Sequence, residues 1–186
     1  RVLLEPSVVE AAERGGRDVD LVSSWFVDEV RSDAESVPYV FAAGLTGQGG
    51  LGELAANVSS SGVAVADTLA ARLDVSVGDM VTLKVPVLGQ RQHLVYREKH
   101  LEVEAIFPLQ AGYIDATLMP PIPGMVGAES CQEWDAGLPI NFARVGPVDE
   151  AHWEQFGGSP QLILSLSTAQ EFWANQYGFL SAVLYP

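Results

Sequence analysis

Residues that could act as nucleophiles, general bases or soft metal ligands are few in this chain and widely spaced. Cys131 is the single cysteine, and His93, His100 and His152 are the three histidines. No CxxC, HxxxH or HExxH spacing connects them, which disfavours a zinc site. Cys131 and His152 could form a nucleophile–base pair, but their spacing does not support one. No serine lies in the G-x-S-x-G sequence of a nucleophile elbow.

Carboxylates are concentrated beside two tryptophans in the second half of the chain. Two carboxylates across a cleft, next to an aromatic platform, are typical of glycoside hydrolysis. Acidic loop residues are also common on solvated surfaces, so a secreted carbohydrate-active hydrolase and a ligand-binding module remain as alternatives. The residues of this cluster are Glu129, Glu133, Asp135, Asp149, Glu150 and Glu154, with Trp134 and Trp153.

A glycine-rich run follows Leu45 and has some likeness to a phosphate-binding loop. Its sequence, TGQGGLGE, lacks the lysine that such a loop carries after its glycines. We therefore interpret this run as a flexible loop. Oxygen-rich calcium loops of the D-x-D-x-D-G kind are also missing from the sequence. We expect neither a cofactor nor a metal ion.

Length and charge limit the classes of partner. The 186 residues are 48% apolar and 18% charged, which is typical of a folded chain with a sizeable core. The formal net charge of −14 excludes nucleic-acid binding and disfavours anionic lipid headgroups. The acidity is greatest in residues 100–186, where Arg144 is the only basic side chain besides His100 and His152. A single cysteine cannot form an intramolecular disulfide.

Strands separated by short helices account for the first half of the chain. Pro6 favours the first turn of a helix, and Asp67 is a candidate cap for a second helix. Val81, Leu83 and Val85 alternate with polar residues, as in a half-buried strand. The predicted strands are 18–30, 36–45, 62–66, 80–87 and two within 93–107, with a tight Gly78-Asp79 turn before the fourth.

The second half begins with a long segment that is neither helical nor extended in pattern. Pro108 to Pro147 contains six prolines, so we expect a long ordered loop or a lid. A helix near 149–156, a buried strand at 161–166, a helix capped by Ser167 and a final strand at 179–184 are expected after it.

Two groups of residues form longer patterns. The first combines a strand end, a helix that ends in Arg-Leu, a Gly-Asp turn, a strand, and a later strand that ends in Ile-Phe. The second combines Asp-x-x-Leu-Met-Pro-x-x-Pro-Gly with Trp-Asp-x-Gly-x-Pro-Ile and two further tryptophans. The first comprises Ala66-Asp67, Leu69, Arg72-Leu73, Gly78-Asp79, Val81 to Leu83 and Val103 to Phe107. The second comprises Asp115, Leu118-Met119-Pro120, Pro123-Gly124, Trp134-Asp135, Gly137, Pro139-Ile140, Asp149-Glu150, Trp153, Pro160, Ser165-Leu166, Gln170 and Trp173.

The first pattern resembles the extracytoplasmic domain of FtsX-like ABC transporter permeases, also known as the MacB-like periplasmic core. The second pattern is more specific and looks like one branch of large bacterial permeases. Ala105 stands where the family has a glycine, and this chain is more acidic than is usual for that branch. The resemblance covers roughly residues 60–173.

The resemblance implies an α+β fold: a mixed α/β unit with an inserted small β-rich subdomain. We expect the unit to comprise residues 1–59 and 110–186 and the insertion to comprise residues 60–109. The chain starts at Arg1 without Met, with no signal peptide and no span of about 20 apolar residues, so we interpret it as an excised soluble domain.

The resemblance also implies a non-catalytic function at the extracytoplasmic face of a bacterial cell membrane. Such a domain couples transmembrane movement to the handling of a substrate or partner outside the membrane. ATP hydrolysis would reside in a separate nucleotide-binding subunit or domain, so we do not expect an enzyme. The expected partners are the transmembrane helices of the same parent chain, the cytoplasmic ATP-binding subunit indirectly, and a second permease copy or an extracytoplasmic accessory protein.

Partner contact is expected in an ordered loop held on a packed scaffold. The candidates are Leu118, Met119, Pro120, Pro123, Gly124 and Trp134. The same segment could instead only wrap the core, and both alternatives remain open. No residue has a predicted catalytic role.

Overall fold

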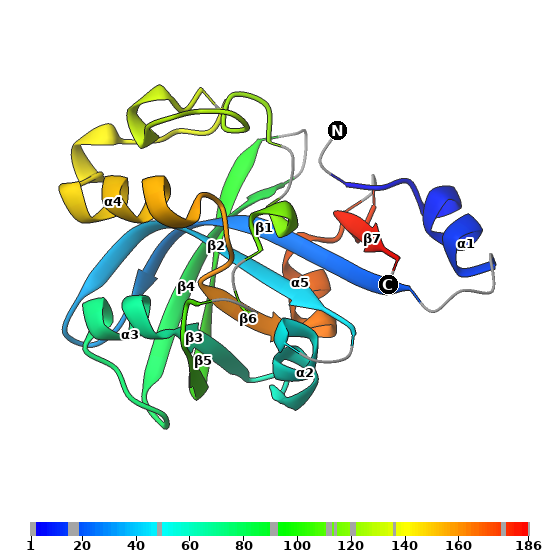
Figure 1. Cartoon of the computed structure of the whole chain (residues 1–186), viewed down its shortest axis with the longest axis horizontal. Coiled ribbons are helices and arrows are strands. Elements are labelled where there is room, and N and C mark those ends of the chain that lie inside the picture. Colours follow the sequence, from blue (N-terminus) through cyan, green and yellow to red (C-terminus); the bar gives the residue numbers. More distant parts are fainter. Residues whose placement is uncertain are drawn as a thin grey trace.

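The computed structural model describes residues 3–14, 19–47, 50–89, 93–110, 113, 115–119, 122–135, 137–175 and 178–185. Helices and strands are mixed along the chain, which confirms the predicted α+β class (Figure 1). The strands are β1 (Asp20–Arg31), β2 (Ser36–Leu45), β3 (Gly62–Ala66), β4 (Met80–Leu88), β5 (Leu94–Phe107), β6 (Leu162–Ser165) and β7 (Ala182–Leu184). The helices are α1 (Pro6–Arg14), α2 (Gly50–Asn57), α3 (Asp67–Leu73), α4 (Pro147–Phe156) and α5 (Leu166–Trp173). Three 3₁₀ turns, η2 (Ala116–Leu118), η3 (Cys131–Glu133) and η4 (Phe142–Arg144), lie between β5 and α4.

The strands form one sheet that closes on itself. Its order is β2-β6-β3-β5-β4-β1, and pairing of β1 with β2 completes the ring, with β7 added to β1. The pairs β2–β6 and β3–β5 are parallel, whereas β1–β2, β1–β4, β3–β6, β4–β5 and β1–β7 are antiparallel. Since β1 pairs with β2 on one side and with β4 and β7 on the other, residues distant in sequence are joined around the ring.

Strand periodicity places the core as the sequence predicts. Val81, Leu83 and Val85 are at most 1% exposed, which confirms the alternation in β4. Leu69 and Leu73 lie one turn apart on α3 and are fully buried against the sheet. The buried residues of β1 to β6, α2, α3 and α5 join in one main hydrophobic core.

The glycine-rich run after Leu45 is partly helical, so its interpretation as a flexible loop is wrong for residues 50–53. Helix α2 begins at Gly50 and buries Leu51, Gly52 and Ala55. A Cβ at Gly52 would lie 2.8 Å from the backbone of Gly47, so this glycine permits close approach of the two segments. Tertiary packing here outweighs the low helix propensity of glycine.

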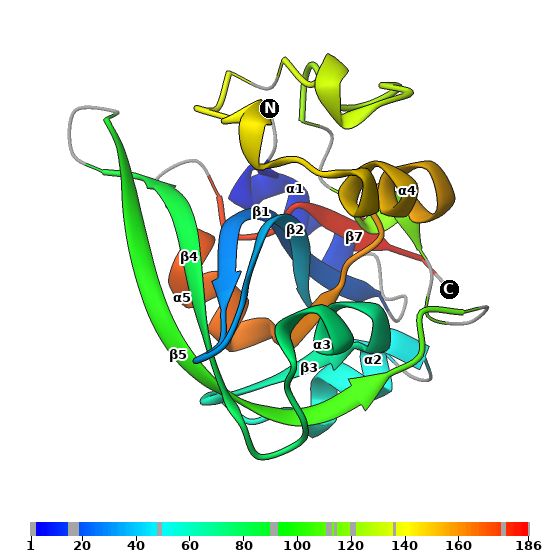
Figure 2. The same cartoon turned by 90° about the vertical axis from the view of Figure 1, so that its left-hand side faces the viewer.

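Residues 94–107 form one continuous strand, so the prediction of two strands is wrong. Strand β5 pairs with β4 over Leu94–Glu102 and with β3 over Glu102–Phe107. The register shifts where Val63 pairs with Val103 and Ala64 with Ala105. Glu104 is the extra residue of this bulge, and its carboxylate accepts a hydrogen bond from the Ser59 N–H at 2.8 Å. Figure 2 shows β4 and β5 extending together beyond the rest of the sheet.

Two predicted helix caps differ from the structure by one or two residues. Helix α5 is capped by Ser165, whose hydroxyl accepts from the Thr168 N–H at 3.3 Å, and not by Ser167. Asp67 is the first residue of α3 and Ala66 its N-cap. The Asp67 carboxylate accepts from Thr68 N–H at 2.7 Å and from Leu109 N–H at 3.1 Å. It therefore also fixes the exit of β5.

The predicted insertion, residues 60–109, supplies β3, α3, β4 and β5. Strand β3 pairs with β6, strand β4 pairs with β1, and their buried residues belong to the same core as those of β2. The division of the chain into two subdomains stays a prediction. Among the described residues, no helix has the length and apolar character needed to cross a membrane.

Candidate functional site

The long proline-rich segment folds over one end of the sheet. We call residues 115–146, apart from 120, 121 and 136, the cover; it lies with α4 above β1 and β2 in Figure 1. Each of its 3₁₀ turns is capped by the side chain that precedes it. Asp115, Ser130 and Asn141 accept from the N–H groups of Thr117, Gln132 and Ala143 at 2.9, 3.0 and 3.1 Å. These caps stabilise the described turns of a segment that has no long helix or strand. The expectation of an ordered loop or a lid over 108–147 stays a prediction, and residues 111, 112, 114, 120, 121 and 136 lie outside the described residues.

A cluster of aromatic side chains lies beneath the cover. Phe26 and Phe41 of the sheet meet Trp134 of the cover and Trp153 of α4. Ring centroids are 6.3 Å apart for Phe26–Trp134, 6.3 Å for Phe41–Trp153 and 4.9 Å for Trp134–Trp153. The cluster is a second buried core, completed by Tyr39, Ile122, Met125 and Cys131. Trp134 and Trp153 therefore pack internally, at 6% and 9% exposed.

Tyr39 joins the cover to the sheet from an unusual backbone conformation. It has φ of 57° within β2, a region that side-chain-bearing residues rarely adopt. Its ring stacks on Phe26 at 5.5 Å, and its hydroxyl accepts from the Asn141 N–H at 2.7 Å. A strained residue that is held on both sides in this way marks a position the surrounding structure depends on.

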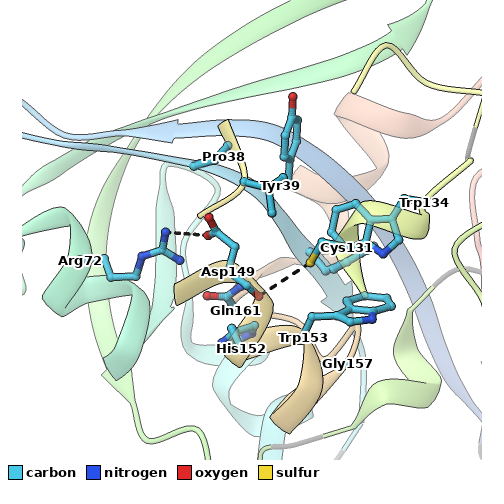
Figure 3. Close-up of a pocket in the computed structure, with 12 residues that line it drawn as sticks. Pro38, Tyr39, Arg72, Cys131, Trp134, Asp149, His152, Trp153, Gly157 and Gln161 are labelled. Atoms are coloured by element: carbon cyan, nitrogen blue, oxygen red, sulfur yellow. Dashed lines mark hydrogen bonds and ion pairs between the residues drawn. The ribbon is translucent and has the colours of Figure 1, made fainter. Parts of the chain in front are cut away.

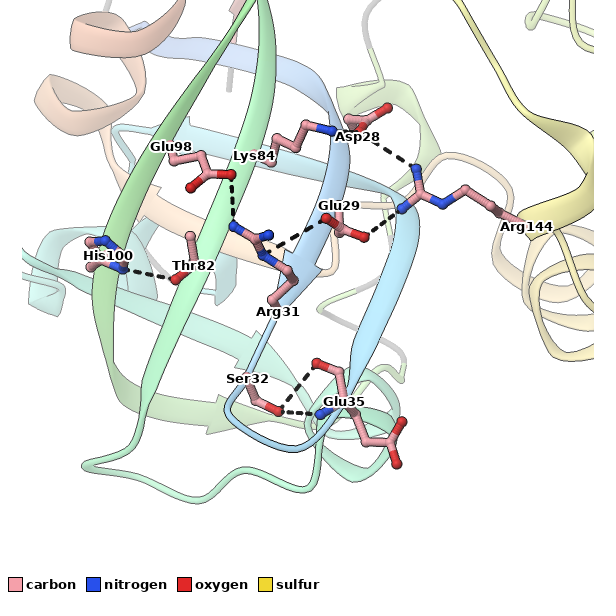
Figure 4. A network of polar contacts seen from close by, with 10 residues as sticks. All are labelled: Asp28, Glu29, Arg31, Ser32, Glu35, Thr82, Lys84, Glu98, His100 and Arg144. Atoms are coloured by element: carbon pink, nitrogen blue, oxygen red, sulfur yellow. Dashed lines mark hydrogen bonds and ion pairs between the residues drawn. The ribbon is translucent and has the colours of Figure 1, made fainter.

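Arg144 makes the ionic connection between cover and sheet. Its guanidinium is 2.8 Å from the Glu29 carboxylate and 3.6 Å from Asp28 (Figure 4). It also lies 5.1 Å from the centroid of the Tyr39 ring. Lys84 is a second partner of Asp28, at 3.0 Å. Its hydrogen bond to Asp28 raises the pKa of Lys84. Two cations thus neutralise an aspartate whose side chain is only 7% exposed.

Asp149 fixes the start of α4. Its carboxylate accepts from the Gly146 N–H at 2.7 Å and pairs with Arg72 of α3 at 2.7 Å. Figure 3 shows this ion pair beside the Cys131 sulfur, which contacts the Asp149 carbonyl oxygen at 3.8 Å. The predicted helix near 149–156 is therefore tied to the first half of the chain through α3.

A small, partly open cavity lies at the edge of the aromatic cluster. Its volume of about 20 Å³ is enough for about one water molecule. Cys131 and His152 both line it, so the structure brings together the two residues considered as a nucleophile–base pair. The Nε1 of Trp134 and the Nε2 of His152 are buried there without a hydrogen-bond partner among the described residues.

The electrostatics of this cavity oppose thiol catalysis. Burial, together with Glu150 and Asp149, raises the pKa of Cys131 to about 12. Burial and then the Arg72 charge lower the pKa of His152 to about 4. Near neutral pH both groups are uncharged, whereas an activated cysteine needs a lowered thiol pKa. The pair fits an internal packing role.

The predicted acidic cluster is divided by the fold: Glu129, Glu150 and Glu154 line one groove with Trp153, whereas Glu133, Asp135 and Asp149 lie outside it. Glu150 accepts from the Cys131 N–H at 3.0 Å and from Ser130, while Glu133 accepts from the Glu129 N–H at 3.0 Å. With Asp149 at the start of α4, these carboxylates stabilise local structure. Trp134 and Trp153 are 6% and 9% exposed, which leaves little indole surface for stacking on a sugar. The hydrolase alternative stays a prediction that this arrangement does not favour.

The candidate partner-contact residues have different positions. Pro123 and Gly124 are exposed and Met119 is half-buried. Leu118 and Trp134 are buried, in the main core and in the aromatic cluster. Pro120 lies outside the described residues. Partner contact by these residues stays a prediction.

Sequence reasoning missed Tyr39 and Arg144, which connect the cover to the sheet. A signal existed for Arg144, because it is the only arginine or lysine in residues 100–186. Nothing local distinguishes Tyr39 from other strand aromatics.

Within the described parts of the chain, no group of three or more His, Cys, Asp or Glu side chains could hold a metal ion. No family model matches the sequence, and a search of curated proteins finds no similar one.

Proposed function

We propose that this chain is a non-catalytic extracytoplasmic domain of an FtsX-like ABC transporter permease. In this proposal the domain couples movement of the parent chain's transmembrane helices to the handling of a substrate or partner outside the membrane. Its location is the outer face of a bacterial cell membrane. ATP hydrolysis belongs to a separate cytoplasmic subunit or domain.

The observation that carries the proposal is the position of the two described ends of the chain. The N–H of Leu4 donates to the carbonyl of Leu180 at 2.8 Å. Strand β7 pairs with the beginning of β1, through Asp20–Leu184, Leu21–Val183 and Val22–Ala182. Figure 1 shows both ends on the same side of the closed sheet. A domain attached through both ends to membrane helices needs its two connections on one side.

The order of elements in the first motif gives further support. Strand β3, helix α3, the Gly78 turn and strand β4 follow one another as the family pattern implies, and Gly78 has φ of 97°. The tightly packed main core is suited to moving as a body when its attachments move.

The test is the gene sequence on both sides of this chain. Apolar spans of about 20 residues before Arg1 and after Pro186 are expected. A parent chain that has a cleavable signal peptide and ends near Pro186 would contradict the proposal. In a parent chain with spans, truncation of residues 19–185 to a short linker is expected to abolish transport while the ATP-binding subunit keeps nucleotide binding.

A further inference from the structure

An open groove lies between the cover and helix α4, on the solvent side of the aromatic cluster. Its volume is about 630 Å³, within the range of roughly 300–1,000 Å³ that ligand sites occupy. Trp153 and Gly157 line both this groove and the small cavity beside Cys131 and His152. We call it the acidic groove, after the side chains that line it: Met119, Met125, Glu129, Glu150, Trp153 and Glu154.

Glycines and one hydrogen bond keep the groove open. A Cβ at Gly158 would collide with the Met119 sulfur, and Gly157 has φ of 56°, so both positions favour glycine. The indole N–H of Trp153 donates to the carbonyl of Ala128 at 3.0 Å. This bond joins the α4 wall to the cover wall, so the two walls are held at a fixed separation.

The charge of the groove is not neutralised within the described part of the chain. The side chains of Glu129 and Glu154 are exposed and have no hydrogen-bond or ion-pair partner there, and no lysine or arginine lines the groove. Glu150, the third glutamate, is held by Ser130 and Cys131. The described bases other than Arg97 form ion pairs elsewhere: Arg14, Arg31, Arg72, Lys84, Lys99 and Arg144.

Apolar surface accompanies this charge. Val126 on the lining of the groove is 61% exposed and Met119 is half-buried, whereas Met125 and Trp153 lie beneath them at 0% and 9% exposed. Arginine matches such a surface, because its guanidinium pairs with carboxylates and its methylene stem packs on aliphatic and thioether groups. Lysine offers the same charge with less contact.

We propose that the acidic groove binds a basic segment of a partner protein, with an arginine or lysine between Glu129 and Glu154 and a neighbouring apolar side chain on Met119 and Val126. The groove is open along the surface rather than enclosed, which suits a chain segment. The net charge of −14 attracts a basic partner. This inference does not depend on the permease proposal.

The experiment titrates the ¹⁵N-labelled 186-residue chain with a capped pentapeptide that has a leucine between two arginines. We expect chemical-shift changes at the Gly127, Gly157 and Gly158 amides and at the Trp153 indole N–H. Raising the salt concentration from 50 to 300 mM should weaken binding, because the attraction is ionic. The same peptide with neutral citrulline in place of arginine should bind at least tenfold more weakly.

Matched variants separate a local effect from net charge. The double variant Glu129→Gln/Glu154→Gln should bind the arginine peptide about fivefold more weakly, as expected for two exposed ion pairs. The control Glu53→Gln/Glu102→Gln removes the same charge from exposed positions outside the groove and should bind within twofold of the parent chain.

Three outcomes overturn the inference. The first is the absence of shifts at the groove resonances at millimolar peptide. The second is equal binding of the citrulline peptide, or equal weakening by both double variants. The third is that arginine amide alone binds as well as the peptide, which would identify a site for small organic cations. None of these outcomes bears on the membrane spans that test the permease proposal.

Discussion

The hydroxyl of Tyr39 accepts a hydrogen bond from the backbone N–H of Asn141 at 2.7 Å, across 102 residues of sequence. This contact, with Arg144 three residues further on, attaches the cover to β1 and β2. Replacing the tyrosine removes the bond but keeps the aromatic packing. Tyr39→Phe is expected to lower the free energy of unfolding by about 0.5–1.5 kcal/mol. Urea denaturation measures it, with exposed Tyr185→Phe as the control; equal effects of the two changes would show that the bond contributes nothing.

Arg144→Met tests the ionic connection. It leaves Glu29 without its 2.8 Å partner and leaves buried Asp28 with Lys84 alone. We expect a loss of about 1–3 kcal/mol of unfolding free energy and faster amide exchange in the cover. The control is Arg14→Met, which removes an ion pair with Glu10 on the surface; the side chains of Arg14 and Glu10 are 75% and 66% exposed. This change should lower the free energy of unfolding by less than about 0.5 kcal/mol. A change at Arg144 no larger than that at Arg14 would contradict the proposed attachment.

Cys131 should be inert while the chain is folded. The thiol is 1% exposed and its pKa is raised to about 12, so almost no thiolate exists at pH 8. An aromatic disulfide reagent should label it at least a hundredfold faster in denaturing urea than in buffer. The control is Cys131→Ala carrying Ser60→Cys, which places a thiol at an exposed position and should react at once. Rapid labelling of native Cys131 would show that the cover opens readily.

The lowered pKa of His152 leads us to expect that the free energy of unfolding falls in mild acid. Its pKa is lowered to about 4 in the folded chain, against an ordinary value of 6.5. The unfolded chain therefore takes up a proton first, and stability present above pH 6.5 is lost as pH falls toward 4. The groups that act on it are Arg72, which lowers its pKa, and Asp149, which raises it. The contribution is at most about 3 kcal/mol.

Denaturation by urea at pH 4.5, 5.5 and 7 measures this effect. His152→Gln should flatten the pH dependence across that interval, whereas exposed His93→Gln should leave it unchanged. If the free energy of unfolding of His152→Gln still falls with pH as steeply as in the parent chain, the acid sensitivity arises from the carboxylates and not from His152.

Gly178→Ala tests the junction of the two ends. A Cβ there would collide with the Leu4 carbonyl, and Gly178 has φ of 154°. We expect the Leu4 amide to lose its protection against hydrogen exchange. We also expect the free energy of unfolding to fall by about 1–3 kcal/mol. Gly127→Ala is the matched control, because φ is 84° but no atom lies within 4 Å, so only backbone strain is added. Retained protection at Leu4 in Gly178→Ala would mean that the ends are not held by this contact.

The local periodicity of the sequence predicted many of the helices and strands, but it could not predict which strands pair with each other. The strand from Ser36 to Leu45 has the predicted bounds, because its signal is carried by consecutive residues. Closure of the sheet depends on the parallel pairing of β2 with β6, at Ala42–Leu162 to Leu45–Ser165, which no local pattern encodes. The single strand β5 was missed for a related reason, since its two halves pair with different partners.

The aromatic cluster was visible only as scattered residues. Trp134 and Trp153 stood out by type, but their partner Tyr39 is 95 residues before Trp134 and looks like an ordinary strand residue. The raised pKa of Cys131 arises from burial and from carboxylates that the fold brings near. Composition alone could not distinguish that thiol from a reactive one.

The short ladder between β1 and β7 determines how the molecule responds to force applied at its two ends. Asp20, the first residue of β1, pairs directly with Leu184, the last residue of β7. Force that pulls the two ends of the chain apart therefore acts on this pair first and then breaks the hydrogen bonds of the ladder one after another. The Leu4–Leu180 bond and this three-residue ladder would therefore open at low tension, while the ring of β1 to β6 stays intact. If the proposed attachment to two membrane helices holds, helices that tilt together would carry the whole domain with them, whereas helices that separate would first peel away β7.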